Sequence, residues 1–236
     1  MRRTVVAALL GVAVAAGAAF AAHAGTGSGK GHCAAYKPRI PAPSQFSKTI
    51  DNPYFPLPVG RTFVYRGVEN GKKELDRMHV TRRTKNIAGI TATVVSDNVY
   101  EPPPKLLEKT FDYYAQDDRG NVWYLGEDTK ELLPGGKVDR SGSWLTGRSG
   151  AKPGLIMEAD PQVADAYRQE CRSGEAEDLA WVVGRGGAKH LLRTLEFSPL
   201  EPSIVERKVY KPRVGISSEQ QLSGGHETLS LVRVTG

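Results

Sequence analysis

Apolar and polar residues alternate along most of the chain after residue 60, which is the pattern of β-strands with one buried face. Phe63 and Tyr65 lie two residues apart, and the Asn70-Gly71 dipeptide after them is typical of tight hairpin turns. The same alternation returns between turn residues as far as Val234. It predicts roughly ten strands with short connections and no long helix.

The predicted strands follow one another closely enough to form an antiparallel meander. One is a polar strand through His79 and Thr81, and the others cover 90–100, 106–116, 121–127, 191–197, 204–210, 215–221 and 228–234. Residues 165–183 are interpreted as two strands joined at Ser173-Gly174, with a helix as the alternative because of their Ala, Glu and Gln content. The predicted fold is mainly β, an antiparallel meander forming an open or closed β-barrel or half-barrel, with a two-sheet β-sandwich as the alternative.

Large aromatic residues gather in the middle of the chain. Tyr113, Trp123 and Tyr124 lie in the hairpin 106–127, and Trp144 lies in the Gly- and Ser-rich stretch 133–161, which is expected to be a long loop. A barrel mouth lined with aromatic groups is a common place for small ligands, so these four are the candidate ligand-binding residues. The alternative is that they only fill the core.

The first 24 residues have the order of a signal peptide. Arg2 and Arg3 precede an apolar run from Val5 to Ala22, and small residues around Ala24 suit cleavage before Gly25. A retained membrane anchor is the alternative, but Ala and Gly dominate the run and favour lipid only weakly. We therefore expect a signal peptide over 1–24, a flexible Pro- and Gly-rich tether over 25–46 and a single β-rich domain over 47–236. The expected location is secreted or extracytoplasmic, in the cell envelope, with no integral membrane span after processing.

Only two cysteines occur, Cys33 and Cys171. In an exported protein such a pair is most simply one disulfide, with two free thiols as the alternative.

The charge pattern argues against nucleic acid as a partner. The formal net charge is +6, but Lys and Arg are interspersed with Asp and Glu, and the one short basic cluster, 82–85, is typical of a solvated strand end. His32, His79, His190 and His226 have no partner at a metal-ligand spacing, so no metal site and no cofactor is predicted.

Four acidic residues are the weak candidates for catalysis: Glu170, Glu175, Glu177 and Asp178. Paired carboxylates act as acid and base when their environments push their pKa values apart. On a strand, Glu175 and Glu177 would face the same side, which makes a site geometrically possible. A solvated edge, or ion pairs with Arg168 and Arg172, is the alternative.

Six segments in order along the chain resemble a group of exported bacterial proteins of unassigned function, often called hypothetical secreted proteins or lipoproteins. The segments are Asp51-Asn52-Pro53-Tyr54-Phe55-Pro56-Leu57 with Ile50 before it, the 112–127 hairpin with Gly120-Asn121-Val122-Trp123-Tyr124, then 142–144, 167–170, 174–178, and 209–210 followed by Gly215. The resemblance implies one domain and an extracytoplasmic location, and it implies no activity.

The leading functional expectation is an exported, non-catalytic binding module that holds a hydrophobic or amphiphilic ligand in the concavity of a β-barrel. Its partner would be a small hydrophobic ligand or a cell-envelope component. Two alternatives stay open: a hydrolase of envelope sugars or peptides that uses the acidic cluster, and a structural envelope interaction domain. Whether any catalysis occurs, and the ligand, strand order and oligomeric state, are not determined by these patterns.

Overall fold

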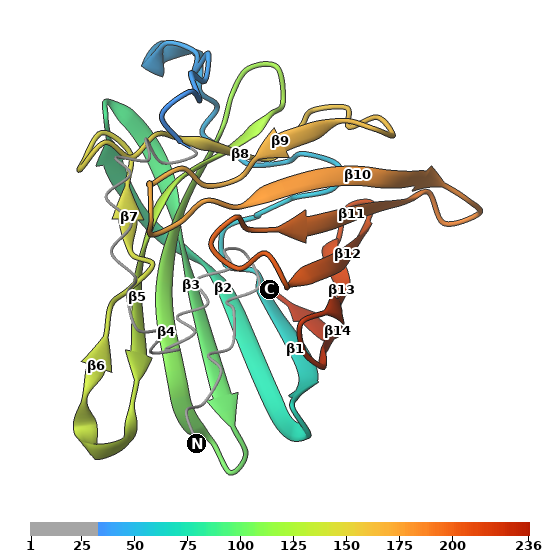
Figure 1. Cartoon of the computed structure of the whole chain (residues 1–236). Helices are drawn as coiled ribbons and strands as arrows, with labels where there is room; N and C mark the ends of the chain where they lie inside the picture. Colours follow the sequence, from blue (N-terminus) through green and yellow to red (C-terminus); the bar gives the residue numbers. More distant parts are fainter. Residues whose placement is uncertain (1–32) are drawn as a thin grey trace.

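A computed structural model describes residues 33–236 and consists of one antiparallel sheet that curls around a central interior (Figure 1). The main path of the sheet runs β6-β5-β4-β3-β2-β1-β14-β13-β12-β11-β10-β9, and the short strands β7 and β8 both pair with β5. Neighbours in the sheet are mostly neighbours in sequence. The chain is therefore a meander, and along its main path the pairing of β1 with β14 joins the beginning and the end of the sheet-forming sequence.

The strands vary from long ribbons to two-residue pieces. The first half contains β1 (Thr62–Glu69), β2 (Lys72–Ile87), β3 (Ile90–Glu101), β4 (Lys105–Gln116), β5 (Val122–Leu132), β6 (Val138–Asp139) and β7 (Trp144–Leu145). The second half contains β8 (Gly154–Met157), β9 (Ala166–Arg168), β10 (Leu179–Gly186), β11 (Leu191–Phe197), β12 (Val205–Lys211), β13 (Gly215–Ser223) and β14 (Glu227–Thr235). The only helical elements of residues 33–236 are two 3-10 turns, Pro43–Gln45 and Pro134–Gly136, so no helix in this range is long enough to cross a membrane.

Strand β2 illustrates how the sequence produces the curved sheet. Glu74, Asp76, Met78 and Val80 lie two residues apart and all four are buried, because alternate side chains of a strand point to the same face. The residues between them are more exposed. The buried face of this strand therefore carries carboxylates as well as apolar groups.

Buried residues lie on both faces of the sheet. On β3, Ala92 and Val94 pack in one apolar cluster, while Val95, whose side chain points to the opposite face, packs in another. We call these the outer core and the inner core. A bulge in β2, where its register against β3 shifts between Val80 and Thr84, interrupts the alternation of that strand.

The inner core fills the centre of the molecule, and the outer core lies on the other side of β2 to β5. The inner core includes Tyr54, Phe55, Tyr65, Met78, Tyr114, Tyr124, Trp144, Met157, Leu192 and Tyr210. The outer core includes Ile87, Ile90, Ala92, Val94, Tyr113, Ala115, Trp123 and Leu125, with Ile40 and Phe46 of the N-terminal segment packed against it.

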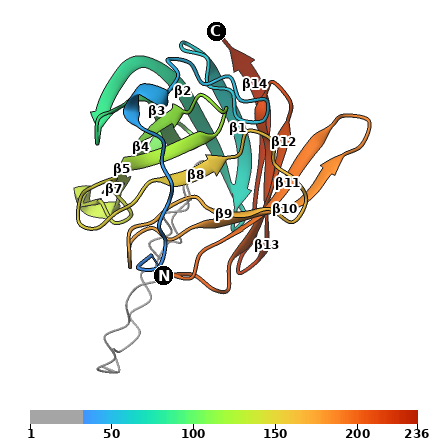
Figure 2. The ribbon, with the colours of Figure 1, turned by 90° about the horizontal axis from the view of Figure 1, so that it is seen from above.

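The ladder of strand pairing does not close into a barrel, but β8 and β9 lie side by side between the two ends of the sheet (Figure 2). An isolated bridge joins Lys152 to Cys171 there, through a 2.8 Å bond from Lys152 N to Cys171 O. Gly154 makes this approach possible, because a Cβ on it would overlap the carbonyl oxygen of Gln169.

The N-terminal segment is tied to this junction. Cys33 forms a disulfide with Cys171, as the sequence predicts. Lys152 donates to the carbonyl oxygens of Cys33 at 2.7 Å and Ala34 at 3.3 Å. The predicted signal peptide, 1–24, and the first part of the predicted tether lie outside the described residues.

The mainly β, open antiparallel meander predicted from the sequence is confirmed, and the alternative of two separate sheets is not observed. The strand predicted over 191–197 is β11, and 165–183 contains two strands, β9 and β10, rather than a helix. The stretch 133–161 was expected to be a loop, yet it contributes β6, β7 and β8. These strands have two to four residues, too few for alternation to be recognised.

Candidate functional site

The interior of the molecule is acidic. Of the 26 Asp and Glu residues, 14 are buried, while Lys208 is the single buried Lys or Arg of residues 33–236. The buried acids are Glu74, Asp76, Asp97, Glu108, Asp112, Asp117, Glu127, Glu170, Glu177, Asp178, Glu196, Glu206, Glu219 and Glu227. Charged side chains are almost never fully buried unless they are paired. The positive net charge of the sequence therefore conceals a negative interior.

One group of buried acids contains its own cation. Lys208 on β12 places its Nζ 2.9 Å from Glu196 Oε2 on β11 and 3.6 Å from Glu219 Oε2 on β13. Glu196 also accepts hydrogen bonds from Tyr210 Oη at 2.9 Å and Thr194 Oγ1 at 2.8 Å. We call Lys208 and its three acidic neighbours Glu196, Glu206 and Glu219 the lysine-paired set.

The electrostatics of this set follow from burial and mutual attraction. Burial alone would lower the pKa of Lys208, but Glu196, Glu219 and Glu206 outweigh it and raise this pKa well above its ordinary value. Burial raises the pKa of Glu206 to about 7, although Lys208 opposes the rise. The ammonium is thus held charged among carboxyl groups.

A second group of buried acids has no such cation. Asp112 on β4, Glu127 on β5 and Glu170 after β9 are each at most 3 % exposed, and no Lys, Arg or His of residues 33–236 forms an ion pair with any of them. Asp112 Oδ1 accepts a 2.7 Å hydrogen bond from Tyr124 Oη. Neither carboxyl oxygen of Glu170 has a hydrogen-bond partner among the described residues. We call Asp112, Glu127 and Glu170 the cation-free set.

The backbone around Glu170 holds this side chain in the interior. Gln169 N and Glu170 N both donate to the carbonyl oxygen of Asp178, at 2.8 and 3.3 Å. The next residue, Cys171, is bound to Cys33 by the disulfide and to Lys152 by the isolated bridge. The unpartnered carboxyl is therefore fixed in place by a disulfide, a strand bridge and the close approach at Gly154.

Burial and like charge both act on the cation-free set. Burial, followed by Asp178, Glu127 and Asp112, raises the pKa of Glu170 well above its usual range, and Lys208 offsets this only weakly. Burial and then Asp112 raise the pKa of Glu127 in the same direction. An isolated buried carboxylate is costly, so such a group must gain either a proton or a positive partner.

An aromatic layer borders these acids. The Tyr114 and Tyr124 rings stack with centroids 4.6 Å apart, and Tyr124 meets Trp144 edge-on at 5.3 Å. The Phe55 ring contacts Tyr114 edge-on, with the ring centroids 5.4 Å apart. Because Tyr124 also binds Asp112, the acidic and aromatic layers adjoin directly.

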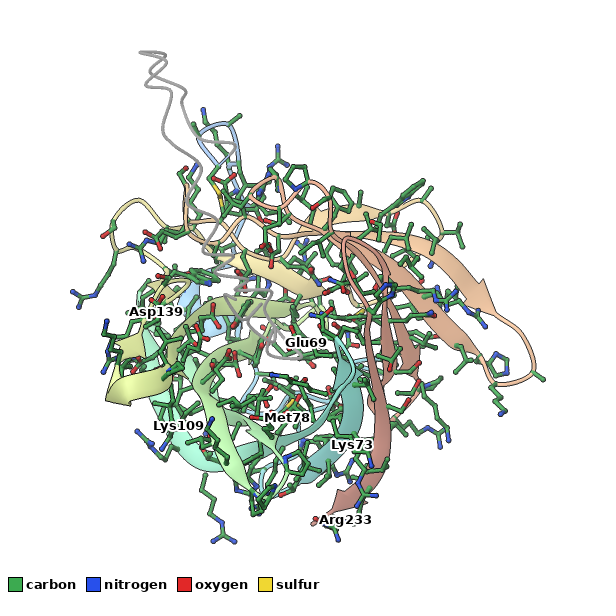
Figure 3. All side chains as sticks on the ribbon, turned by 60° about the horizontal axis from the view of Figure 1, so that its bottom comes forward. Glu69, Lys73, Met78, Lys109, Asp139 and Arg233 are labelled. Atoms are coloured by element: carbon green, nitrogen blue, oxygen red, sulfur yellow. A yellow bond between two sulfur atoms is a disulfide. The ribbon has the colours of Figure 1, made fainter. Side chains whose placement is uncertain are left out.

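More acids lie along the strands beyond this layer. Burial first, with nearby acids, raises the pKa of Glu74 to about 9 and that of Glu227 to about 8, and burial raises that of Glu108 to about 8. Thr110 donates to Glu108 at 2.9 Å. Figure 3 looks toward this part of the molecule, where Met78 lies inside the ring of strands and Lys109 lies on its periphery.

The structure separates the four predicted catalytic candidates. Glu170, Glu177 and Asp178 are buried, but Glu175 is exposed in a turn and pairs with Arg172 at 3.7 Å. The expected strand through 175–177 is absent, so Glu175 and Glu177 do not share a face. Glu177 Oε1 accepts the Gly174 N–H at 2.8 Å and closes this turn.

The predicted ligand-binding aromatics lie on two faces of the sheet. Tyr124 and Trp144 belong to the inner core, whereas Tyr113 and Trp123 belong to the outer core. Trp123 Nε1 donates to Asp117 at 2.9 Å, and Lys85 lies 4.0 Å from the Tyr113 ring centre. Adjacent strand residues point to opposite faces, so the pair Trp123 and Tyr124 could not share one surface.

A small pocket lies beside Phe55, Phe63, Met78 and Ile216. Its volume is about 10 Å³, which is room for about one water molecule. Residues 33–236 also contain no group of three or more His, Cys, Asp or Glu side chains arranged to hold a metal ion. The cation-free set is one of several groups of buried acids here without an ion pair among residues 33–236; Asp76 and Asp97 are another.

Reasoning from the sequence missed Asp112 and Glu127 as site residues. A sequence signal was present, since Asp112 lies two residues from Tyr114 on β4, on the same side of the alternation, and both side chains are buried. Acids at inward positions of alternating strands could have been recognised in this way. Which acids meet across the interior depends on how the sheet curls.

No protein-family model matches the sequence, and no curated protein is significantly similar to it. Two crystal structures are similar in fold. One, from Bacteroides fragilis, is provisionally described as an exported protein with a YmcC-like fold; it has 12% identity and a TM-score of 0.46, and the match covers 78% of this chain and all of that one. The other, from Parabacteroides distasonis, is provisionally described as a lipoprotein; it has 9% identity and a TM-score of 0.38, with 78% of this chain and 99% of that one covered.

Proposed function

We propose that this protein is an exported, non-catalytic binding module that holds an amphiphilic ligand against the inner face of its open sheet. The observation that carries the proposal is the contact between two unlike layers. Tyr124 belongs to the stacked aromatic layer and also binds Asp112 of the cation-free set. An amphiphile has the matching division into an apolar and a polar part.

The electrostatics of the acids support binding over hydrolysis. Acid–base catalysis by two carboxyl groups needs one group kept protonated and one kept ionised. Here burial pushes the pKa values of Asp112, Glu127 and Glu170 in the same direction. Glu175 is solvent-exposed and ion-paired on the surface, away from these groups.

The proposal of an extracytoplasmic location rests on the predicted signal peptide and on the disulfide. The bond between Cys33 and Cys171 connects the first described residue to the junction of the sheet. Disulfides of this structural kind persist in oxidising compartments and are rare in the cytosol.

The test is native mass spectrometry of protein purified gently from its own host, compared with the mass after denaturation. We expect an additional mass that is lost on denaturation and that belongs to an amphiphile. Trp144→Phe, which alters the aromatic layer, should reduce the bound fraction. Trp181→Phe is the matched control, because Trp181 is 45% exposed on β10 and lies outside the inner core.

A bare protein under conditions that preserve weak complexes, together with no effect of Trp144→Phe on any ligand offered, would contradict the proposal. The same purified samples also test location, because the protein must be recovered from the extracytoplasmic fraction with its disulfide formed.

A further inference from the structure

We infer that the cation-free set is a binding site for an organic cation with N–H donors, namely a protonated primary amine or a guanidinium group on an apolar body. This inference deepens the proposed function, on which it rests, by naming the charge and chemistry of the ligand. Three features of the described residues carry it: an orphaned carboxyl, an internal precedent and the neighbouring aromatic rings.

The orphaned carboxyl is that of Glu170. The side chain is fully buried, and neither of its oxygens has a hydrogen-bond partner among residues 33–236. Buried polar side chains in native proteins almost always have a partner, so an exception calls for an explanation. Its strongest electrostatic neighbours are Asp178, Glu127 and Asp112, so the carboxyl faces other acids.

The internal precedent is Lys208. In the lysine-paired set, this fold already holds an ammonium group among buried acids, at 2.9 Å from Glu196 and 3.6 Å from Glu219. The cation-free set offers the same type of groups on β4, β5 and the segment after β9, without a lysine. An ammonium supplied by a ligand would complete it in the same manner.

The chemistry favours an N–H donor over a metal ion or a quaternary ammonium. The described residues contain no cluster of three acids placed to hold a metal ion. The Glu170 oxygens need donors, which a quaternary ammonium lacks, whereas a primary ammonium has three and a guanidinium has five. The rings of Tyr124 and Trp144 beside the acids add the aromatic surface against which organic cations pack well.

The experiment is a calorimetric titration of the purified, disulfide-bonded protein with four probes that share one alkyl chain: octylamine, octyltrimethylammonium, octanol and octanoate. We expect octylamine to bind at least about tenfold more tightly than each of the other three. Equal binding of octanol or octanoate would overturn the inference and leave the proposed function standing. Binding of none of the four would overturn both, and equal binding of octyltrimethylammonium would overturn the requirement for N–H donors.

Variants locate the site. Glu170→Gln keeps the shape and removes the charge, so it should weaken octylamine binding by about tenfold or more without lowering stability, and leave octanol binding unchanged. Glu175→Gln is the matched control on the exposed turn and should change neither. Unchanged octylamine binding by Glu170→Gln would overturn the assignment.

A second variant keeps the test valid if Glu170→Gln fails to fold. Glu127 is buried on β5, where its backbone pairs with that of Asp112 on β4. Glu127→Gln keeps the side-chain shape and removes another acid of the cation-free set, so it should weaken octylamine binding by about tenfold or more and leave octanol binding unchanged. Undiminished octylamine binding by a folded Glu127→Gln protein would contradict the inference.

Discussion

The two groups of buried acids in this interior differ in one residue type. The lysine-paired set joins Glu196, Glu206 and Glu219 to Lys208, whereas the cation-free set joins Asp112 and Glu127 to Glu170 without any Lys, Arg or His of residues 33–236. Both are buried to the same degree, so burial does not distinguish them. The difference is whether the fold itself supplies the positive charge.

This comparison teaches that the same inward positions can serve structure or binding. A buried carboxyl with an internal ammonium is satisfied and holds three strands together, while one without it must take up a proton or a cation from outside. The lysine-paired set therefore serves as the control for the cation-free set within one molecule.

The largest expected effect is that of pH on the acids that lack a cation. Burial raises the pKa of Glu74 to about 9 and of Glu108 and Glu227 to about 8, from an ordinary value of 4.5. Between the ordinary pKa and the raised pKa of each acid, the folded chain keeps a proton that the unfolded chain releases. The contribution of these protonated acids to the free energy of unfolding is thus fully present below about pH 4.5. It falls by about 1.4 kcal/mol per pH unit for each such proton and is lost once the pH has risen through 8 to 9. Urea unfolding at pH 5, 7 and 9 measures this loss, and a profile that is flat or rises toward pH 9 would contradict it.

Removing the cation of the lysine-paired set should make it resemble the other set. Lys208→Met leaves buried acids without a partner, and we expect a loss of about 3–5 kcal/mol in the free energy of unfolding. Lys211→Met, on the exposed end of the same strand, is the control and should cost little. Denaturant unfolding at neutral pH measures the free energy of unfolding of both variants. Equal stability of Lys208→Met and Lys211→Met would refute the structural role assigned to Lys208.

Breaking the disulfide should loosen the cation-free set and leave the lysine-paired set intact. Cys33 and Cys171 are 138 residues apart, and removing such a bond typically costs about 2–5 kcal/mol. Because Cys171 follows Glu170, we expect Cys33→Ser to lower octylamine affinity as well as stability. Amide hydrogen exchange should rise first around 169–178 and last in β11 to β13, and uniform exchange would argue against a local anchor.

Neutralising the orphaned carboxyl should stabilise the protein. Burial, followed by Asp178, Glu127 and Asp112, raises the pKa of Glu170 above its usual range, so the ionised carboxylate is less favourable in the folded chain than in the unfolded chain. Glu170→Gln removes this unfavourable ionisation, and we expect the variant to be more stable than the original protein at pH 7, with a gain that shrinks toward pH 4.5. Thermal unfolding at both pH values checks the sign, and destabilisation at pH 7 would show that Glu170 has a favourable partner.

The smallest effect is expected for the exposed acid of the original cluster. Glu175 pairs with Arg172 at 3.7 Å, and both side chains are partly exposed. Glu175→Gln should change the free energy of unfolding by less than about 1 kcal/mol, since surface ion pairs contribute little. A larger change measured by urea unfolding would mean that this turn contributes to the buried sites.

Much of the fold could be predicted because its signals are local. Asn70-Gly71 connects β1 to β2 with both residues at positive φ, and the strand predicted over 191–197 has the observed bounds. The disulfide could be predicted from the number of cysteines and the expected compartment. The strands of 133–161 could not, because they are held by pairing with β5 rather than by their own pattern.

The candidate site was predicted only in part. Glu170 and Tyr124 were recognised as candidates, for different functions, and the structure places them in the interior with Asp112 and Glu127. Glu175 was grouped with Glu170 by its position in the chain, although it lies in an exposed turn. Closeness in sequence is a poor guide to which charges meet across a curved sheet.

The sequence by itself determined a meander of alternating strands, because hydrophobic period and turn residues act over a few neighbours. It also carries an excess of positive charge, which says nothing of where the negative charges lie. Only the tertiary structure decided that 14 acids are buried and that one set has Lys208 while the other has no cation among residues 33–236. The physical reason is that bulges, register and the curl of the sheet set the inward face of each strand, and a shift of one residue would send the same acids to solvent.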